Sequence, residues 1–503
     1  MAQPFSHDEH QFVASGWWLA YAGLIPYRDF PYHHMPYQIP LDALAVHLSP
    51  YLLLSARLVS WVAGWLASGI VMLMVFREWR DRGRWLAVGA AATAVIVFVS
   101  NPITAYTTGQ AWNHDWAIAL ALIALMLQVR AVDRPAGWQG VSAVGVLSGL
   151  AAGVRLSLAV LCPLFVVSAW LIPGTTRQRW ARAGAVLAGT GLAGLPATLL
   201  LALDSKAFGY GNVLYPILNS QYREVLRHWS GDALLAKVAY FGETVLSRPA
   251  NVALLAAFVF VAALAFAGRP RDARHRHVLG LTALATVLLF MTAFGPTPSW
   301  YQYFFACVPF AILTLAFAAA RASRTNPGRL IVATTALAAL VCSLSGDWDP
   351  NSVRRLQSPE TWVPVQVHRF GMRLAAEVPC GRVLTLGPLL PMEGGLLTYE
   401  ALTAGPFTWR VAHIIPEANR RLVGWVGRDD LDAALEASSP AAILTGLETA
   451  NEGFEPGERG NLEAPLDEYA ANRGYRLTTV DAPFMPGELN LWLPSSLPSG
   501  CTG

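Results

Sequence analysis

The chain has 503 residues, of which 54% are hydrophobic and only 14% are charged. In soluble domains about a quarter of the residues are usually charged, so this composition excludes an ordinary soluble protein and favours a membrane protein. Five cysteines are too few for a disulfide-rich scaffold, and a formal net charge of +3 gives no indication of a nucleic-acid partner.

The N-terminal stretch combines acidic, basic and aromatic side chains directly before the first long apolar run. Asp8 and Glu9 form an acidic pair, and residues 12–24 are compatible with an amphipathic helix whose Trp and Tyr lie at a membrane interface. A carboxylate held at a membrane surface is well suited to act as a general base, although a solvated polar terminus would have the same sequence pattern.

A second polar group follows in the same stretch. Arg28 and Asp29 are adjacent, and His33 and His34 come shortly after them. These residues offer a cation, an anion and two imidazoles, but an Arg–Asp pair that only holds a turn explains the pattern equally well. Adjacent histidines cannot both face one point on a helix, so a metal site that used both would need an irregular backbone.

Apolar runs then alternate with short polar loops as far as residue 345. A membrane span needs about 17–25 apolar residues, so several of the runs are clear spans. The pair around residues 140–172 is short, and we expect two helices that meet at residues 153–157 near one face of the membrane. The runs are 54–76, 86–100, 115–129, 140–153, 156–172, 183–203, 251–268, 278–294, 301–320 and 329–345.

Arginine placement orients these runs. The alternate loops 101–113 and 295–300 contain no Lys or Arg. By the positive-inside rule the arginine loops are cytoplasmic, and residues 1–45, 101–113, 204–249 and 346–503 are outside. The arginines are Arg77, Arg80, Arg82 and Arg84, then Arg130 and Arg134, then Arg177, Arg179 and Arg182, then Arg269, Arg271, Arg274 and Arg276, and finally Arg321, Arg324 and Arg329.

We therefore expect three parts. Residues 1–45 form a first external loop with interfacial helices, residues 46–345 a transmembrane domain of about ten spans, and residues 346–503 an extracytoplasmic α/β domain. Cys380 and Cys501 lie in the last part, and two alternatives stay open for them: they form a disulfide bridge with each other, or they are two unrelated thiols. The alternating pattern of this part predicts helices near 360–377, 429–437 and 463–473, and strands at 382–386, 441–445, 475–480 and 489–493.

Two sites inside the apolar region carry polar groups. His114 and Asp115 open a span after Asn113, and helix capping and catalysis both explain them. Arg155 lies between two apolar half-spans, where a charge is costly and an anion such as a lipid phosphate is its expected partner. The alternative is that Arg155 only extends to the membrane surface.

The loop before the span at 301–320 is fixed by Pro296 and Pro298 and leads into Tyr301 and Gln302. Its aromatic residues would also fit an ordinary interfacial belt. The sequence contains no Walker loop, no dinucleotide-binding glycine motif, no HExxH and no serine nucleophile elbow. Because no predicted cytoplasmic segment is large enough to bind a nucleotide, an activated donor would come from the membrane.

Together these stretches resemble the GT-C superfamily of polyprenyl-phosphate-sugar glycosyltransferases, of the family 39 type that includes protein mannosyltransferases and the lipid A aminoarabinose transferase. In this chain the first span of that family, which normally precedes the acidic pair, is missing, so we expect a span encoded upstream. His114 and Arg155 stand where proline and lysine are commoner. The matching stretches are DEHQF (8–12) with GLIPYRDFPYHHMPYQIPL (23–41), AWNHDWAIALALIAL (111–125), GVLSGLAAGVRLSLAVL (145–161) and PTPSWYQYFFACVPFAIL (296–313).

The resemblance implies a polytopic helical protein of the bacterial inner membrane that transfers a hexosyl or pentosyl group, with inversion, from a polyprenyl-phosphate donor to an external glycan, lipid or protein. Asp8 would be the general base, and Glu9 would orient the acceptor or share that role. The donor phosphate would be bound by Arg155, Arg28 and Tyr301. Supporting site residues would be Asp29, His33, His34, His114, Asp115 and Gln302.

No cofactor is expected to be obligatory, and a divalent metal stays an alternative. Two other functions stay open, namely a transporter or lipid flippase and a membrane scaffold without catalysis. Transporters hold charge near the midplane and often contain repeats of broken helices, which are not evident here. A transferase requires Asp8, Asp115 and Arg155 around one outward-facing cavity.

Overall fold

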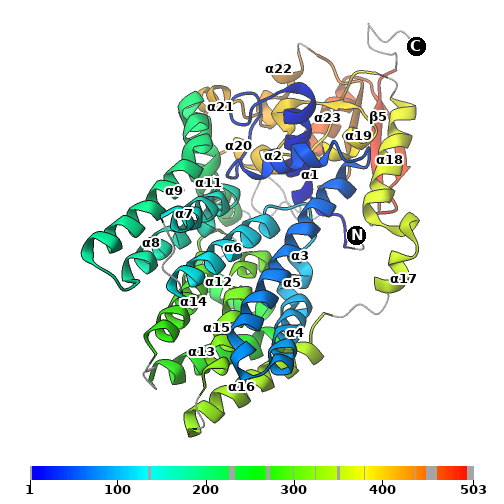
Figure 1. The fold of residues 1–503 in the computed structure, drawn as a ribbon. Helices are drawn as coiled ribbons and strands as arrows, with labels where there is room; N and C mark the ends of the chain where they lie inside the picture. Colours follow the sequence, from blue (N-terminus) through cyan, green and yellow to red (C-terminus); the bar gives the residue numbers. More distant parts are fainter. Residues whose placement is uncertain are drawn as a thin grey trace.

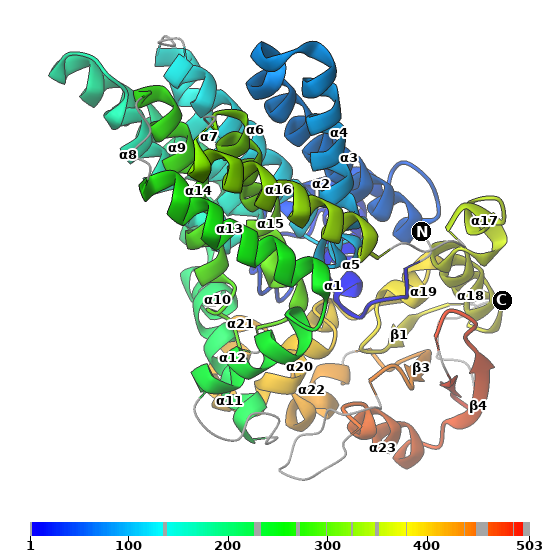
Figure 2. The same cartoon turned by 90° about the horizontal axis from the view of Figure 1, so that it is seen from below.

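The computed structural model consists of a bundle of long apolar helices and a smaller α/β region at one end of the bundle (Figures 1 and 2). The structure describes residues 3–133, 138–225, 233–267, 272–297, 299–322, 325–347, 352–378, 380–436, 438–448, 461–485 and 487–495.

Each predicted apolar run corresponds to a helix of the bundle, and short 3-10 helices lead into α8 (Leu156–Val160) and α15 (Tyr301–Cys307). Seven helices of the described chain are long and apolar enough to cross a membrane, and three shorter apolar helices accompany them. The predicted polytopic helical fold is therefore confirmed. The helices are α3 (Leu52–Trp79), α4 (Arg84–Ser100), α6 (His114–Asp133), α7 (Trp138–Val154), α8 (Leu161–Leu171), α9 (Thr176–Leu203), α13 (Pro249–Ala267), α14 (Ala273–Thr292), α15 (Val308–Ala320) and α16 (Asn326–Leu344).

Helices α7 and α9 pack with their backbones in contact. A Cβ on Gly145 would lie 2.0 Å from the carbonyl oxygen of Val186, and one on Gly189 would lie 2.2 Å from that of Ser142. Small residues at such a crossing allow the close approach that drives helix association in a membrane. The two short helices expected around residues 140–172 are present as α7 and α8, and the chain between them is extended at Arg155 (φ −146°, ψ 114°).

The N-terminal helix differs from the expected interfacial helix over residues 12–24. Helix α1 (Asp8–Trp17) begins earlier, and its residues 9–16 are buried. They pack with α2 (Gln38–Ala45), with α3 and with the C-terminal region in one apolar cluster, so protein rather than lipid covers them. A Cβ on Gly16 would lie 2.6 Å from Cβ of Asp42, which shows how closely α1 and α2 approach.

The C-terminal region contains a five-stranded mixed sheet in the order β2-β1-β3-β5-β4. Strand β1 (Arg382–Leu384) is parallel to β2 (Leu397–Thr398) and β3 (Ala442–Thr445), whereas β5 (Glu488–Leu493) is antiparallel to β3 and to β4 (Arg476–Asp481). The four predicted strands and the three predicted helices are all present. The two-residue strand β2 is too short to leave a pattern in the sequence. The helices are α18 (Val363–Glu377), α19 (Leu389–Glu393), α20 (Pro406–Ala412), α21 (Glu417–Val423), α22 (Leu431–Leu435) and α23 (Ala464–Asn472).

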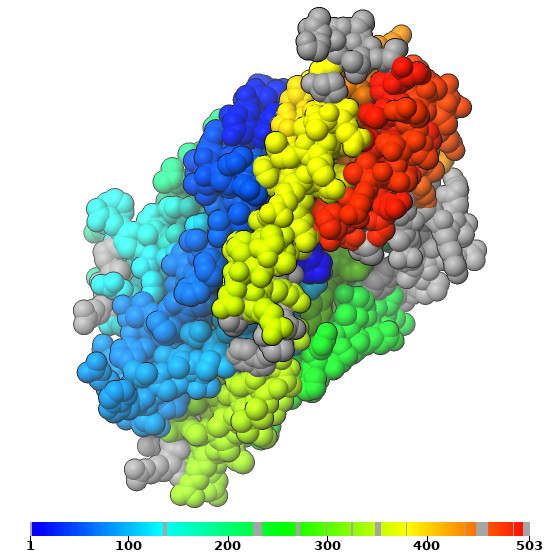
Figure 3. All heavy atoms as spheres, turned by 90° about the vertical axis from the view of Figure 1, so that its right-hand side faces the viewer, coloured from blue at the N-terminus to red at the C-terminus, as the bar shows by residue number. Residues whose placement is uncertain are grey.

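A buried carboxylate attaches this region to the first long helix. Glu393 accepts hydrogen bonds from the backbone N–H groups of Leu52 and Leu53 at 3.1 and 2.8 Å, and its Oε2 lies 2.8 Å from Nδ1 of His368. An acidic side chain is favourable at a helix N-terminus, where N–H groups lack partners within the helix. In Figure 3 the yellow segment that contains α18 accordingly lies along the blue N-terminal part of the chain. Cys380 is disulfide-bonded, and Cys501 lies outside the described residues.

Candidate active site

A cavity of about 240 Å³ lies where the helix bundle meets the C-terminal region. Its walls come from α1, from the loop before α2, from the loop before α6, from Arg155 between α7 and α8, and from α20. Of the predicted site residues, the cavity is lined by Asp8, His33, His34, His114, Arg155 and Gln302.

The two adjacent carboxylates of α1 have different surroundings. Asp8 lines the cavity. Glu9 is fully buried and does not line it, because its carboxylate accepts hydrogen bonds from Nε and Nη2 of Arg57 at 2.7 and 2.6 Å and from the backbone N–H of Ala111 at 2.9 Å. Successive residues of an α-helix point about 100° apart, so one of the two carboxylates can face a cavity while the other is held in the core.

Asp8 has an imidazole beside it. Oδ1 of Asp8 lies 3.5 Å from Nε2 of His7, and Nδ1 of His7 lies 3.2 Å from Oε1 of Glu448. Burial raises the pKa of Asp8, and the charge of His7 opposes that rise. A carboxylate with a raised pKa is a stronger base than an ordinary aspartate, which suits it to accept a proton at neutral pH.

Arg155 is fixed by polar and aromatic neighbours on one wall. Its Nη1 donates to Oδ1 of Asn113 at 3.0 Å and lies 3.0 Å from Nε2 of His114. The guanidinium carbon is 4.9 Å from the centre of the Tyr303 ring. None of these neighbours is an anion, so the arginine keeps its charge available to a ligand in the cavity.

Two arginines that the sequence analysis did not single out also line the cavity. Arg410 on α20 is 3% exposed, and its Nη2 donates to Oδ1 of Asn219 at 2.9 Å and to the hydroxyl of Tyr215 at 3.3 Å. Arg223 on α11 (Tyr215–Val225) is 6% exposed. The only signal for Arg410 was a basic residue inside the apolar segment PFTWRVA, and nothing local indicated that it faces the bundle.

The other predicted site residues do not line this cavity. Arg28 and Asp29 pair with each other at 2.7 Å on the surface, and Asp29 accepts a hydrogen bond from the backbone N–H of Ile25. This arrangement matches the alternative interpretation, in which the Arg–Asp pair only holds a turn. The hydroxyl of Tyr301 accepts from Nδ2 of Asn251 at 3.1 Å. Oδ2 of Asp115 accepts from the backbone N–H of Gly109 at 2.8 Å, so it closes the loop before α6. The expectation that one cavity brings together Asp8, Asp115 and Arg155 therefore holds for Asp8 and Arg155 and is wrong for Asp115.

The cavity is electrostatically positive. Burial lowers the pKa of His34 to about 3 and that of His33 well below its usual range, so both imidazoles are neutral. The wall then carries the three guanidinium groups of Arg155, Arg223 and Arg410 against the one carboxylate of Asp8, with His7 beside that carboxylate. Such a cavity favours a ligand that carries negative charge. Within the residues that the structure describes, no cluster of three or more His, Cys, Asp or Glu side chains could hold a metal ion.

The fold is shared with the solved structures of ArnT, a lipid A aminoarabinose transferase of the group that the sequence resembles. No protein-family model matches the sequence, and no curated protein matches it either.

The chain is similar to the crystal structure of ArnT from Cupriavidus metallidurans bound to undecaprenyl phosphate, with a TM-score of 0.59, 14% identity, and coverage of 97% of this chain and 94% of that one. For ArnT from the same organism in the apo state the TM-score is 0.59 at 13% identity, and the match covers 96% of this chain and 93% of that one. For the oligosaccharyltransferase AglB from Archaeoglobus fulgidus, in complex with an inhibitory peptide and a dolichol-phosphate, the TM-score is 0.45 at 12% identity, covering 89% and 66%.

Proposed function

We propose that the protein is a glycosyltransferase that moves a sugar from a polyprenyl-phosphate donor to an acceptor hydroxyl, with Asp8 as the general base. The observation that carries this proposal is one cavity that holds a half-buried carboxylate with a raised pKa together with three arginines. The GT-C fold and the undecaprenyl phosphate bound to ArnT support a lipid-linked donor.

In the proposed reaction the acceptor oxygen attacks the anomeric carbon from the face opposite the phosphate. A new C–O bond forms while the bond between the anomeric carbon and the phosphate oxygen breaks, and its electron pair stays on the phosphate. Asp8 takes the acceptor proton as the attack proceeds. The configuration at the anomeric carbon is inverted, and the products are the glycosylated acceptor and the polyprenyl phosphate.

The negative charge that develops on the leaving phosphate needs positive groups fixed before the reaction. We assign this role to Arg155 together with Arg410 and Arg223, in place of Arg28 and Tyr301, which lie outside the cavity. Arginine is suited to this task because its planar fork can donate two hydrogen bonds to phosphate oxygens. Fixed donors in a site shielded from water stabilise a transition state more than the same groups do in water.

The remaining predicted residues receive positioning roles. Glu9 holds α1 in place through Arg57, and Asp115 shapes the loop that carries Asn113 and His114, which in turn hold Arg155. His7 lies between Asp8 and Glu448 and would hold the carboxylate of Asp8 in position. The arginine loops at the opposite end of the bundle support an extracytoplasmic location for the cavity.

The test is transfer by the full-length protein in nanodiscs with synthetic polyprenyl-phosphate sugars, measured by mass spectrometry as released polyprenyl phosphate. Asp8→Asn should lower the rate by about two to four orders of magnitude, the usual contribution of a general base. Asp432→Asn is the matched control, because Asp432 lies on the surface in an exposed pair with Arg473. Equal rates for Asp8→Asn and wild type would refute the assignment, and movement of an intact donor across the membrane without release would favour a flippase.

A further inference from the structure

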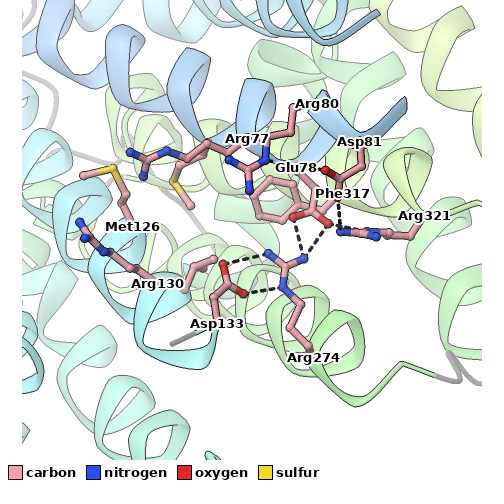
Figure 4. Close-up of a pocket in the computed structure, with 12 residues that line it drawn as sticks. Arg77, Glu78, Arg80, Asp81, Met126, Arg130, Asp133, Arg274, Phe317 and Arg321 are labelled. Atoms are coloured by element: carbon pink, nitrogen blue, oxygen red, sulfur yellow. Dashed lines mark hydrogen bonds and ion pairs between the residues drawn. The ribbon is translucent and has the colours of Figure 1, made fainter. Parts of the chain in front are cut away.

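A second cleft lies at the arginine-rich end of the bundle and has no part in the proposed transfer (Figure 4). It measures about 430 Å³ and is formed by the C-terminal ends of α3, α6 and α15 and by the first turn of α14. Its charged side chains are Arg77, Glu78, Arg80, Asp81, Arg130, Asp133, Arg274 and Arg321.

The cleft and the candidate active site lie at opposite membrane faces. Helix α3 contacts Glu9 through Arg57 near its start and contributes Glu78 to the cleft near its end. At about 1.5 Å per residue, the helix between Arg57 and Glu78 spans roughly 30 Å, which is the thickness of the hydrocarbon core of a bilayer. The arginine cleft is therefore level with the head groups of the other leaflet.

A buried carboxylate holds the cleft in a defined shape. Glu78 is 5% exposed and accepts from Nη1 of Arg274 at 2.7 Å and from Nε of Arg321 at 2.9 Å. Nε of Arg274 also donates to Oδ1 of Asp133 at 2.6 Å. Figure 4 shows these dashed contacts meeting at one side of the cleft, so three helices are fixed relative to one another before any ligand binds.

The mouth of the cleft carries excess positive charge. Five arginines face three carboxylates, which leaves a net charge of +2 on its lining. Arg77 and Arg130 are exposed, and neither has an ion-pair partner within the described part of the chain. Arg77 and Arg130 lie beside the arginines that Glu78 binds and are not neutralised by that carboxylate, so together they favour a phosphate group.

The interior of the cleft is apolar. Met74 and Phe317 are 4% and 2% exposed, and Met126 and Val129 are half-buried beside them. A soluble anion such as inorganic phosphate gains nothing from these side chains, whereas an amphiphile places its phosphate at the arginines and its first carbon atoms on the apolar wall. Basic pockets between transmembrane helices at the cytoplasmic face have this character when they bind anionic lipid head groups.

We propose that this cleft binds the phosphate head group of an anionic phospholipid in the leaflet opposite the candidate active site. Arg77 and Arg130 contact the phosphate, and the groups around Glu78 hold the cleft open. A zwitterionic lipid binds less well because its own cation offsets the phosphate charge.

The experiment is native mass spectrometry of the detergent-solubilised full-length protein, titrated with dioleoyl-phosphatidylglycerol, with dioleoyl-phosphatidylcholine, or with inorganic phosphate. The wild type should retain the phosphatidylglycerol preferentially. Arg77→Gln with Arg130→Gln should weaken that binding about thirtyfold, since each basic residue near a head group contributes a factor of about five. Asp81→Asn, which removes a carboxylate from the mouth, should tighten binding about fivefold.

The control is Arg84→Gln with Arg276→Gln, because both arginines are exposed at the same end of the bundle and do not line the cleft. Unchanged phosphatidylglycerol binding in this control, together with its loss in the double variant of the cleft, supports the proposal. Equal binding by both double variants overturns it. Binding of inorganic phosphate at Arg77 and Arg130 without any lipid preference assigns the cleft to a soluble phosphate and overturns the lipid assignment.

Discussion

Glu9 and Arg57 form a two-point ion pair in which both side chains are completely buried, with Nε–Oε1 and Nη2–Oε2 distances of 2.7 and 2.6 Å. The pair connects α1 to the first turns of α3 across 48 residues of sequence. Because Asp8 directly precedes Glu9 on α1, the same contact sets the direction in which Asp8 faces. Stability and the position of the proposed base therefore depend on one interaction.

Glu9→Gln should destabilise the protein strongly. Removal of one partner of a buried ion pair leaves the other charge without compensation and costs about 3–5 kcal/mol. The measurement is the thermal unfolding midpoint in detergent, with Asp432→Asn as control, because the exposed Asp432–Arg473 pair should contribute no more than about 1 kcal/mol. If Glu9→Gln lowers turnover as much as Asp8→Asn while the unfolding midpoint is unchanged, Glu9 itself acts as a catalytic residue.

The pH dependence of transfer should report the environment of Asp8. Burial raises the pKa of Asp8, so the acid limb of kcat/KM should lie above the usual range for an aspartate, with activity lost as pH falls through the raised pKa. The positive charge of His7 opposes this rise. His7→Gln should therefore move the acid limb to higher pH. His47→Gln is the control and should leave the acid limb unchanged, because His47 is exposed. An acid limb at the wild-type pH in His7→Gln contradicts the proposed coupling between His7 and Asp8.

Arg155 should determine affinity for the donor phosphate. Arg155→Met should weaken binding of a polyprenyl phosphate about ten- to a hundredfold, because a hydrogen bond to a charged group contributes about 1.5–3 kcal/mol. Arg155→Lys keeps the charge but loses the two-point geometry, so it should bind with intermediate affinity. Affinity is measured in nanodiscs by titration calorimetry. Wild-type affinity in Arg155→Met would remove Arg155 from the phosphate site.

Glu463 should make stability depend on pH. Burial raises the pKa of Glu463 to about 8, although the backbone N–H groups of Gly446 and Glu448 donate to its Oε2. The folded state then binds a proton that the unfolded state has released, so the free energy of unfolding should fall as pH rises from about 4 to about 8. Glu463→Gln should abolish this fall.

At pH 8 the Glu463→Gln protein should therefore be more stable than wild type by at least about 1 kcal/mol, and near pH 4 the two should be equal. The comparison is made from thermal unfolding midpoints at both pH values. Glu468→Gln is the control, because Glu468 is exposed on α23, the helix that Glu463 directly precedes. A gain of equal size at both pH values would show that the effect does not come from titration of Glu463.

The sequence by itself determined the membrane bundle, four of the five strands of the C-terminal region and the interruption at Arg155. These are local properties. A span is defined by the length of an apolar run and a strand by a short apolar pattern between turn residues, so neither needs information from distant parts of the chain. The sequence also indicated the acidic pair at Asp8 and Glu9 and the polar group at His114, because polar side chains beside apolar runs are candidates for a function.

Only the tertiary structure decided which of these polar groups meet. Asp8 faces the cavity because Arg57, far along the chain, binds Glu9, while Asp115 binds the backbone of Gly109 instead. Arg410 reaches the cavity because α20 packs on α11, almost 200 residues away in sequence. The direction of a side chain depends on which partners satisfy its charge once it is buried. Those partners come from distant segments, so no local pattern could name them.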